Sequence, residues 1–86
     1  MNSYKLKIST PDGNVFEDEV VKFDVRGLEG DLAVMAGHIP FMTALKPCDC
    51  KIMLPDGDER VGSVAGGLLS VGTEDVVLLT SGFKWK

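Results

Sequence analysis

The residues that could do chemistry in this chain are few, and the single histidine, His38, is the first to consider. It lies in the stretch EGDLAVMAGHIPFMTAL (residues 29–45), between a glycine and an Ile-Pro pair. Histidine can act as a base or a metal ligand at neutral pH, but either role needs partner residues. Two other interpretations are open. The ring could bond a backbone carbonyl within a turn that Pro40 stiffens, or it could be displayed for contact with another protein.

The chain does not supply the partners that catalysis would need. None of its serines lies in a G-x-S-x-G context, and its acidic residues fall mostly in turns, where turn formation accounts for them. The glycine-rich stretch 62–67 lacks the Lys-Ser/Thr ending of a phosphate loop, and the acidic stretch 56–59 lacks the spacing of a calcium loop. We therefore expect no catalytic residue, no metal site and no cofactor.

The two cysteines, Cys48 and Cys50, are separated by one residue. On a strand such positions face the same way, and a disulfide between them would be badly strained. Two thiols and one distant histidine also fall short of the four ligands of a structural zinc. We expect both cysteines to be free, reduced thiols.

Length and charge exclude several classes of protein. With 86 residues the chain is expected to form a single domain, 1–86, with a modest core. A formal net charge of −4 and scattered basic residues argue against binding to nucleic acid. No apolar run approaches the roughly 20 residues that span a bilayer, and MNSYKLKIST has no signal-peptide core. We expect a soluble chain without direct membrane insertion, which could still reach a membrane surface through a partner.

Alternating apolar residues dominate the sequence. Tyr4, Leu6 and Ile8 alternate with polar residues, as they do in the stretch 21–26, which is typical of half-buried strands. Pro-Asp-Gly turns recur at 11–13 and 55–57. Further strands are expected at 32–35, 41–45, 51–54, 59–65, 68–71 and 76–79. The last of these is apolar throughout and is predicted to be a central strand covered on both faces. The sequence predicts an all-β fold, a small antiparallel β-sandwich of two packed sheets with no long helix.

The stretch from Glu29 to Pro47 also carries a family signature. It resembles the epsilon subunit of F-type ATP synthase, which reads G-x-x-G-[ED]-[LF]-x-[IV]-x-x-G-H-x-P here, followed by an apolar stretch and Lys-Pro. The stretches 7–16, 19–23, 65–71 and 76–79 are similar to other strands of that family, so the likeness covers most of the chain. Ala33 and Cys48 stand where the family usually has glycine. The two-helix C-terminal domain of bacterial members has no counterpart, so the resemblance does not extend to the inhibition attributed to those helices.

The resemblance implies a non-catalytic subunit of the central stalk in a proton- or sodium-transporting ATP synthase, on the cytoplasmic side of the cell membrane. Such a subunit binds the gamma subunit on one face and the c-ring at one end, and helps to couple ion translocation to ATP synthesis. Carried over by position, the c-ring contact falls on Glu29, Gly30, Asp31 and His38.

Candidates for the gamma contact are harder to assign from the sequence. They are Pro40, Phe41 and Met42, although for Met42 a core position is favoured because methionine fills gaps in small cores. The alternative to a stalk subunit is a free-standing β-sandwich module that binds a protein or ligand unrelated to ATP synthase.

Overall fold

The computed structural model describes residues 3–27, 30–37 and 39–86, and over those ranges it contains strands and turns but no helix. The predicted all-β class is confirmed. The strands are β1 (Tyr4–Thr10), β2 (Gly13–Val20), β3 (Lys22–Gly27), β4 (Gly30–Met35), β5 (Phe41–Leu45), β6 (Cys48–Met53), β7 (Glu59–Val64), β8 (Gly67–Val71), β9 (Asp75–Thr80) and β10 (Phe83–Trp85).

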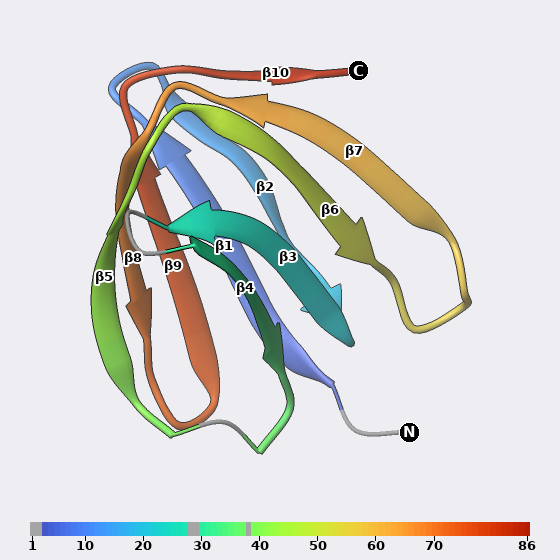
Figure 1. The fold of residues 1–86 in the computed structure, drawn as a ribbon. Helices are drawn as coiled ribbons and strands as arrows, with labels where there is room; N and C mark the ends of the chain where they lie inside the picture. The colour runs from blue at the N-terminus through green and yellow to red at the C-terminus, as the bar shows by residue number, and fades with distance from the viewer. Residues whose placement is uncertain (1–2, 28–29, 38) are drawn as a thin grey trace.

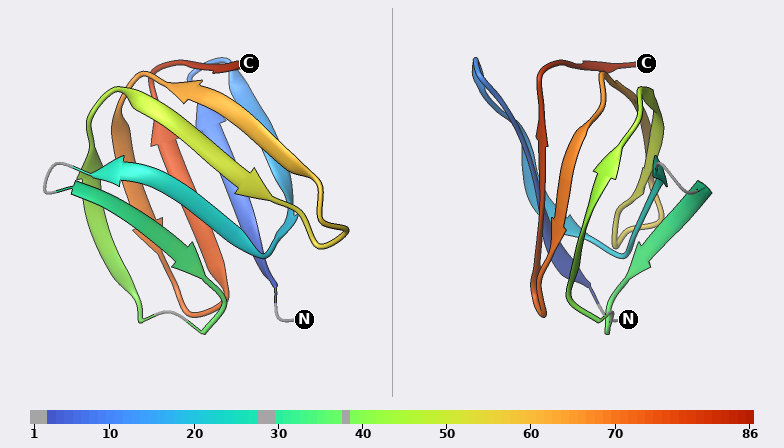
Figure 2. Two further views of the ribbon diagram at one scale, coloured as in Figure 1. Left: turned by 45° about the vertical axis from the view of Figure 1, so that its right-hand side comes forward. Right: turned by 60° about the vertical axis from the view of Figure 1, so that its left-hand side comes forward.

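The strands form two layers that pack face to face (Figure 1). Hydrogen-bonded neighbours follow the order β10-β7-β6-β3-β5-β8-β9-β1-β2, and β4 lies off this path, beside β3. The path bends where β3 meets β5, because those strands share only the pair Gly27 and Leu45. We call the layer β10-β7-β6-β3-β4 sheet I and the layer β5-β8-β9-β1-β2 sheet II. Figure 2 shows the two layers nearly edge on in its right-hand view.

The predicted antiparallel pairing holds for every pair described here except one. Strands β1 and β9 run parallel, with Leu6 opposite Val76 and Ile8 opposite Leu78. Parallel neighbours need a long connection, and here the chain between them forms most of the domain. This pairing was not anticipated, since alternation within a strand carries no information about its neighbours.

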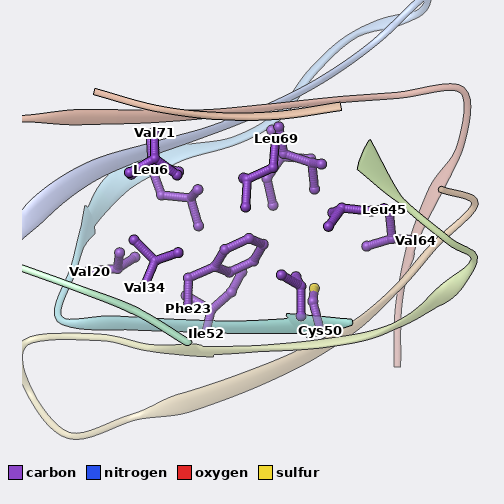
Figure 3. Close-up of a cluster of buried hydrophobic side chains, with 14 of the residues drawn as sticks. Leu6, Val20, Phe23, Val34, Leu45, Cys50, Ile52, Val64, Leu69 and Val71 are labelled. Atoms are coloured by element: carbon purple, nitrogen blue, oxygen red, sulfur yellow. The ribbon is translucent and has the colours of Figure 1, made fainter. Parts of the chain in front are cut away.

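The core fills the space between the layers (Figure 3). Leu6, Leu69 and Val71 of sheet II point toward Phe23 and Ile52 of sheet I, and all five are at most 3% exposed. Each comes from a position of the alternating pattern, so alternation alone predicts which side of a strand faces inward.

Glycine shapes the turns that the sequence suggested. Gly13 and Gly57, the third residues of the two Pro-Asp-Gly turns, have φ of +125° and +93°. Residues with a side chain rarely adopt these angles, which explains the glycine at each position. The second of these turns joins β6 to β7 in an antiparallel hairpin, as predicted.

Two strands of the structure were not expected from the sequence. Strand β2 is exposed along most of its length and has no apolar alternation, and β10 has only three residues. Strand β10 pairs with β7, and the Trp85 ring meets the ring of Phe16 on β2 edge-to-face, with centroids 5.8 Å apart. Strand β10, at the end of sheet I, therefore contacts β2, at the end of sheet II, at the top of the sandwich (Figure 1).

Candidate functional site

The outer face of sheet II carries an unusual concentration of exposed apolar side chains. Met42 of β5, Leu68 of β8 and Leu79 of β9 are 64%, 39% and 50% exposed. Their strands are direct neighbours, and Leu68 lies opposite Leu79 in the ladder. Since residues two apart face the same way, Ala44 and Val77 belong to the same surface, and both are half-buried. We call these five residues the apolar face, and the half-buried Ser70 lies among them, opposite Met42 and Val77.

The apolar face depends on a close approach of two backbones. Gly67 begins β8 with a φ of +151°, and a Cβ atom built there would collide with the carbonyl oxygen of Leu79. Only glycine lets β8 approach β9 in this way. This close contact between β8 and β9 lies directly beside Leu68, so the Gly66-Gly67 pair sets how β8 presents the Leu68 side chain.

The outer face of sheet I has the opposite character. It carries four ion pairs among the described residues: Lys22–Asp24 at 3.8 Å, Arg26–Asp31 at 2.7 Å, Lys51–Glu59 at 3.9 Å and Lys86–Asp49 at 2.9 Å. Paired charges on an exposed surface keep it well solvated and contribute little to stability. The contrast between the two faces makes sheet II the candidate for an apolar docking surface.

A hollow on sheet I does not alter that conclusion. It has a volume of about 730 Å³, and its lining mixes three acidic and two basic side chains with uncharged ones such as Leu32, Pro47 and Val61. No group of three or more His, Cys, Asp or Glu side chains in the described ranges could hold a metal ion. The hollow has the chemistry of a solvated surface.

The structure describes two of the four residues predicted for the c-ring contact. Gly30 and Asp31 begin β4, whereas Gly37 follows its other end, and Figure 1 shows these ends well apart. A strand of six residues spans roughly 20 Å. Glu29 and His38 lie outside the described residues. Gly30 and Asp31 are adjacent, and the assignment of the whole group to the c-ring contact stays a prediction.

Asp31 has a partner that the sequence did not suggest. Its carboxylate accepts a hydrogen bond from Nε of Arg26 at 2.7 Å, across the β3–β4 ladder. This hydrogen bond and the charge of Asp31 raise the pKa of Arg26. Both side chains are exposed, so the pair can orient Asp31 without removing it from solvent.

The residues predicted for the gamma contact are divided between two environments. Pro40 and Met42 are exposed, and the prediction that Met42 lies in the core is wrong. Phe41 lies opposite Val71, which is buried, so its ring is on the inward side of β5 although 41% of it is exposed. Of the three, Met42 belongs to the apolar face.

Leu79 corrects a second expectation. The apolar run Val76–Leu79 was predicted to be covered on both sides, yet only its inward positions, Val76 and Leu78, are fully buried. An apolar run signals burial without showing whether the chain's own core or another molecule provides the cover. Sequence reasoning thus missed Leu68 and Leu79 as surface residues. The available signal was an all-apolar strand in a domain with too few other elements to cover both of its faces.

The cysteines behave as expected. Both are free, with Cys48 half-buried and Cys50 buried. Burial raises the pKa of the Cys50 thiol to about 11, which leaves it protonated and unreactive near neutral pH.

The comparisons with known proteins agree with the β-sandwich fold. Residues 3–86 match the family described as the ATP synthase delta/epsilon chain, beta-sandwich domain. The chain belongs to that family.

Two relatives of this delta/epsilon domain are similar in sequence. The ATP synthase epsilon chain of Clostridium novyi (strain NT) is 35% identical over 83 residues, covering 96% of this chain and 63% of the relative. The sodium-ion-specific ATP synthase epsilon chain of Acetobacterium woodii is 30% identical over 83 residues, covering 96% and 62%. The delta/epsilon domain thus spans less than two thirds of the length of these relatives.

Solved structures support the fold of the delta/epsilon domain. A chain in the Euglena gracilis mitochondrial ATP synthase (OSCP/F1/c-ring, rotational state 1) superposes with a TM-score of 0.91 at 22% identity, covering 96% of this chain and 53% of that chain. A chain in the central stalk/c-ring structure of the Tetrahymena thermophila mitochondrial ATP synthase gives 0.76 at 13% identity, covering 95% and 66%. At these identities the likeness concerns the fold alone.

Proposed function

We propose that this chain is the sandwich domain of an ATP synthase epsilon subunit and that its apolar face binds the gamma subunit. The observation that carries the proposal is the concentration of exposed Met42, Leu68 and Leu79 on one face of a domain whose other face is lined with ion pairs. The names of the two sequence relatives support the assignment to an epsilon subunit.

The apolar face has suitable chemistry for a lasting protein contact. Stable interfaces have an apolar centre and a polar rim. Here the centre is Leu68 and Leu79, and the next strand, β1, presents Lys7 opposite Val77 and Ser9 opposite Leu79. Lys7 and Ser9 thus provide a polar border on the β1 side, where they can pair with polar groups of gamma and set the register of the contact.

In this role the domain breaks no bonds in a substrate. It passes torque between the ion-driven ring and gamma, which requires a stiff body with contact surfaces held at fixed positions. A close-packed sandwich meets that requirement, because its core deforms little under load. The domain lies on the cytoplasmic side of the cell membrane and is held there by the complex. Over the described residues, no helix is long and apolar enough to cross a bilayer.

Contact with the polar loops of the c-ring is assigned to Glu29, Gly30, Asp31 and His38, on the basis of the family signature. Because Arg26 holds the Asp31 carboxylate at the surface, Asp31 is placed to meet a basic or amide group of the ring. In the assembled enzyme, Asp31→Arg with His38→Ala is expected to lower ion pumping per ATP hydrolysed, with the melting temperature of the domain unchanged within a few degrees. An unchanged number of ions pumped per ATP hydrolysed in this double variant would show that neither residue makes the proposed c-ring contact.

The direct experiment is co-elution with the cognate gamma subunit on size exclusion. The chain is expected to shift to the volume of a one-to-one complex, and Met42→Lys is expected to abolish the shift because it places a charge in the apolar face. Met35→Lys is the matched control, since Met35 is 54% exposed on the outer face of sheet I. Separate elution of the unmodified chain and gamma would contradict the proposal.

A further inference from the structure

Strand β4 has few attachments to the rest of the domain. It lies off the main strand path and pairs with β3 alone among the described strands. Of its side chains, only Val34 is fully buried, and Ala33 and Met35 are exposed. Yet β4 carries Asp31 near its start and leads at its end into the loop that begins at Ala36. Its position therefore decides where both lie relative to sheet II.

One side-chain hydrogen bond ties β4 to the opposite sheet. The hydroxyl of Tyr4, on β1 of sheet II, donates to the carbonyl oxygen of Val34 at 2.6 Å. The bond is buried, and Tyr4 and Val34 are only 4% and 1% exposed. Burial, and then the charge of Asp24, raise the pKa of Tyr4, so the hydroxyl keeps its proton and remains a donor throughout the physiological range.

We infer that Tyr4 is a positioning residue, whose hydroxyl holds β4, and with it Asp31, at a fixed place relative to the apolar face of sheet II. The inference rests on the proposed function, in which gamma contacts sheet II and the c-ring contacts the start of β4. Torque passing between those contacts must cross from one sheet to the other.

The other links between the layers restrain β4 less directly. The single β3–β5 pair, Gly27 with Leu45, joins the sheets at one corner. Core packing is strong but non-directional, and it permits small sliding movements. A hydrogen bond of 2.6 Å has a narrow range of distances and angles, so the bond from Tyr4 fixes β4 along the direction of sliding.

The first test is amide hydrogen exchange of the full chain carrying Tyr4→Phe, which removes the hydroxyl and keeps the ring. Amides of the β3–β4 hairpin are expected to exchange on the order of tenfold faster, while those of β8 and β9 change less than twofold.

Thr80→Val is the matched control for this exchange measurement. It deletes another buried hydroxyl, whose hydrogen bonds go to Gly66 and Gly82 and not to β4. Unchanged exchange in β4, or an equal rise in all strands of Tyr4→Phe, would overturn the inference.

The second test separates positioning from general loosening. In the assembled enzyme, Tyr4→Phe is expected to lower the number of ions pumped per ATP hydrolysed, and gamma affinity is expected to stay within twofold of the unmodified chain. If the Tyr4→Phe enzyme pumped as many ions per ATP hydrolysed as the Thr80→Val enzyme, the positioning role would be contradicted. If the unmodified chain did not bind gamma at all, the proposed function would fall, whereas the exchange result would still report on the link between Tyr4 and β4.

Discussion

Replacement of Leu79 by alanine tests the apolar face most quantitatively. Leu79 is 50% exposed in the free domain, so about half of its side chain is available for burial by a partner. Full burial of a leucine side chain contributes about 1.5–3 kcal/mol, so half of it is worth about 1 kcal/mol, or roughly a fivefold change in Kd. Leu79→Ala should therefore weaken gamma binding about fivefold, as measured by isothermal titration calorimetry at 25 °C.

The control for this experiment is Met35→Ala. Met35 is 54% exposed, nearly the same as Leu79, but it lies on the ion-paired face of sheet I. Its removal should leave the Kd within twofold of the unmodified value. Thermal unfolding of both variants, followed by circular dichroism, shows that each is folded at the temperature of the titration. An unchanged Kd for Leu79→Ala together with a weakened Met35→Ala would refute the assignment of the docking face.

Two further predictions concern the domain itself. Gly67→Ala should lower the free energy of unfolding, measured by urea titration, by about 3 kcal/mol or more, because its Cβ would meet the Leu79 carbonyl at a φ that favours glycine. Gly57→Ala has open space around its Cβ and should lower the free energy of unfolding by about 1–2 kcal/mol in the same titration. Iodoacetamide at pH 8 should label Cys48 but not Cys50 in the folded chain, as read by mass spectrometry, and labelling of both would contradict the burial of Cys50. Folding raises the pKa of the Cys50 thiol from 9.0 to about 11, so the unfolded chain loses the thiol proton at a lower pH than the folded chain does. The free energy of unfolding should therefore fall as the pH rises between those two values, and it should fall less in Cys50→Ala.

Alternation predicted the inward-facing residues well because it is a local property of a strand. Tyr4, Leu6 and Ile8 were assigned to one face from spacing alone, and all three are buried. Strand β2 was not predicted because its Glu17-Asp18-Glu19 stretch is polar on both faces. Among the described strands it pairs with β1 alone, at the end of sheet II. A strand with little to bury leaves little pattern in the sequence.

The candidate site depended on information that spacing does not carry. Met42, Leu68 and Leu79 are far apart in the chain and become neighbours only through the order β5-β8-β9. Their apolar character was visible in the sequence, but Met42 and Leu79 were interpreted as buried because the sequence does not show which face of sheet II remains uncovered. The Tyr4 hydroxyl reaches Val34 across a separation of 30 residues, which is equally invisible to local patterns.

The measurement that tests the central claim most directly is site-specific photo-cross-linking in the assembled ATP synthase. A benzophenone side chain is placed at position 79 on the apolar face or at position 35 on the opposite face. We expect a covalent adduct with the gamma subunit from position 79 and none from position 35. A gamma adduct from position 35, with none from position 79, would show that the domain docks through its other face.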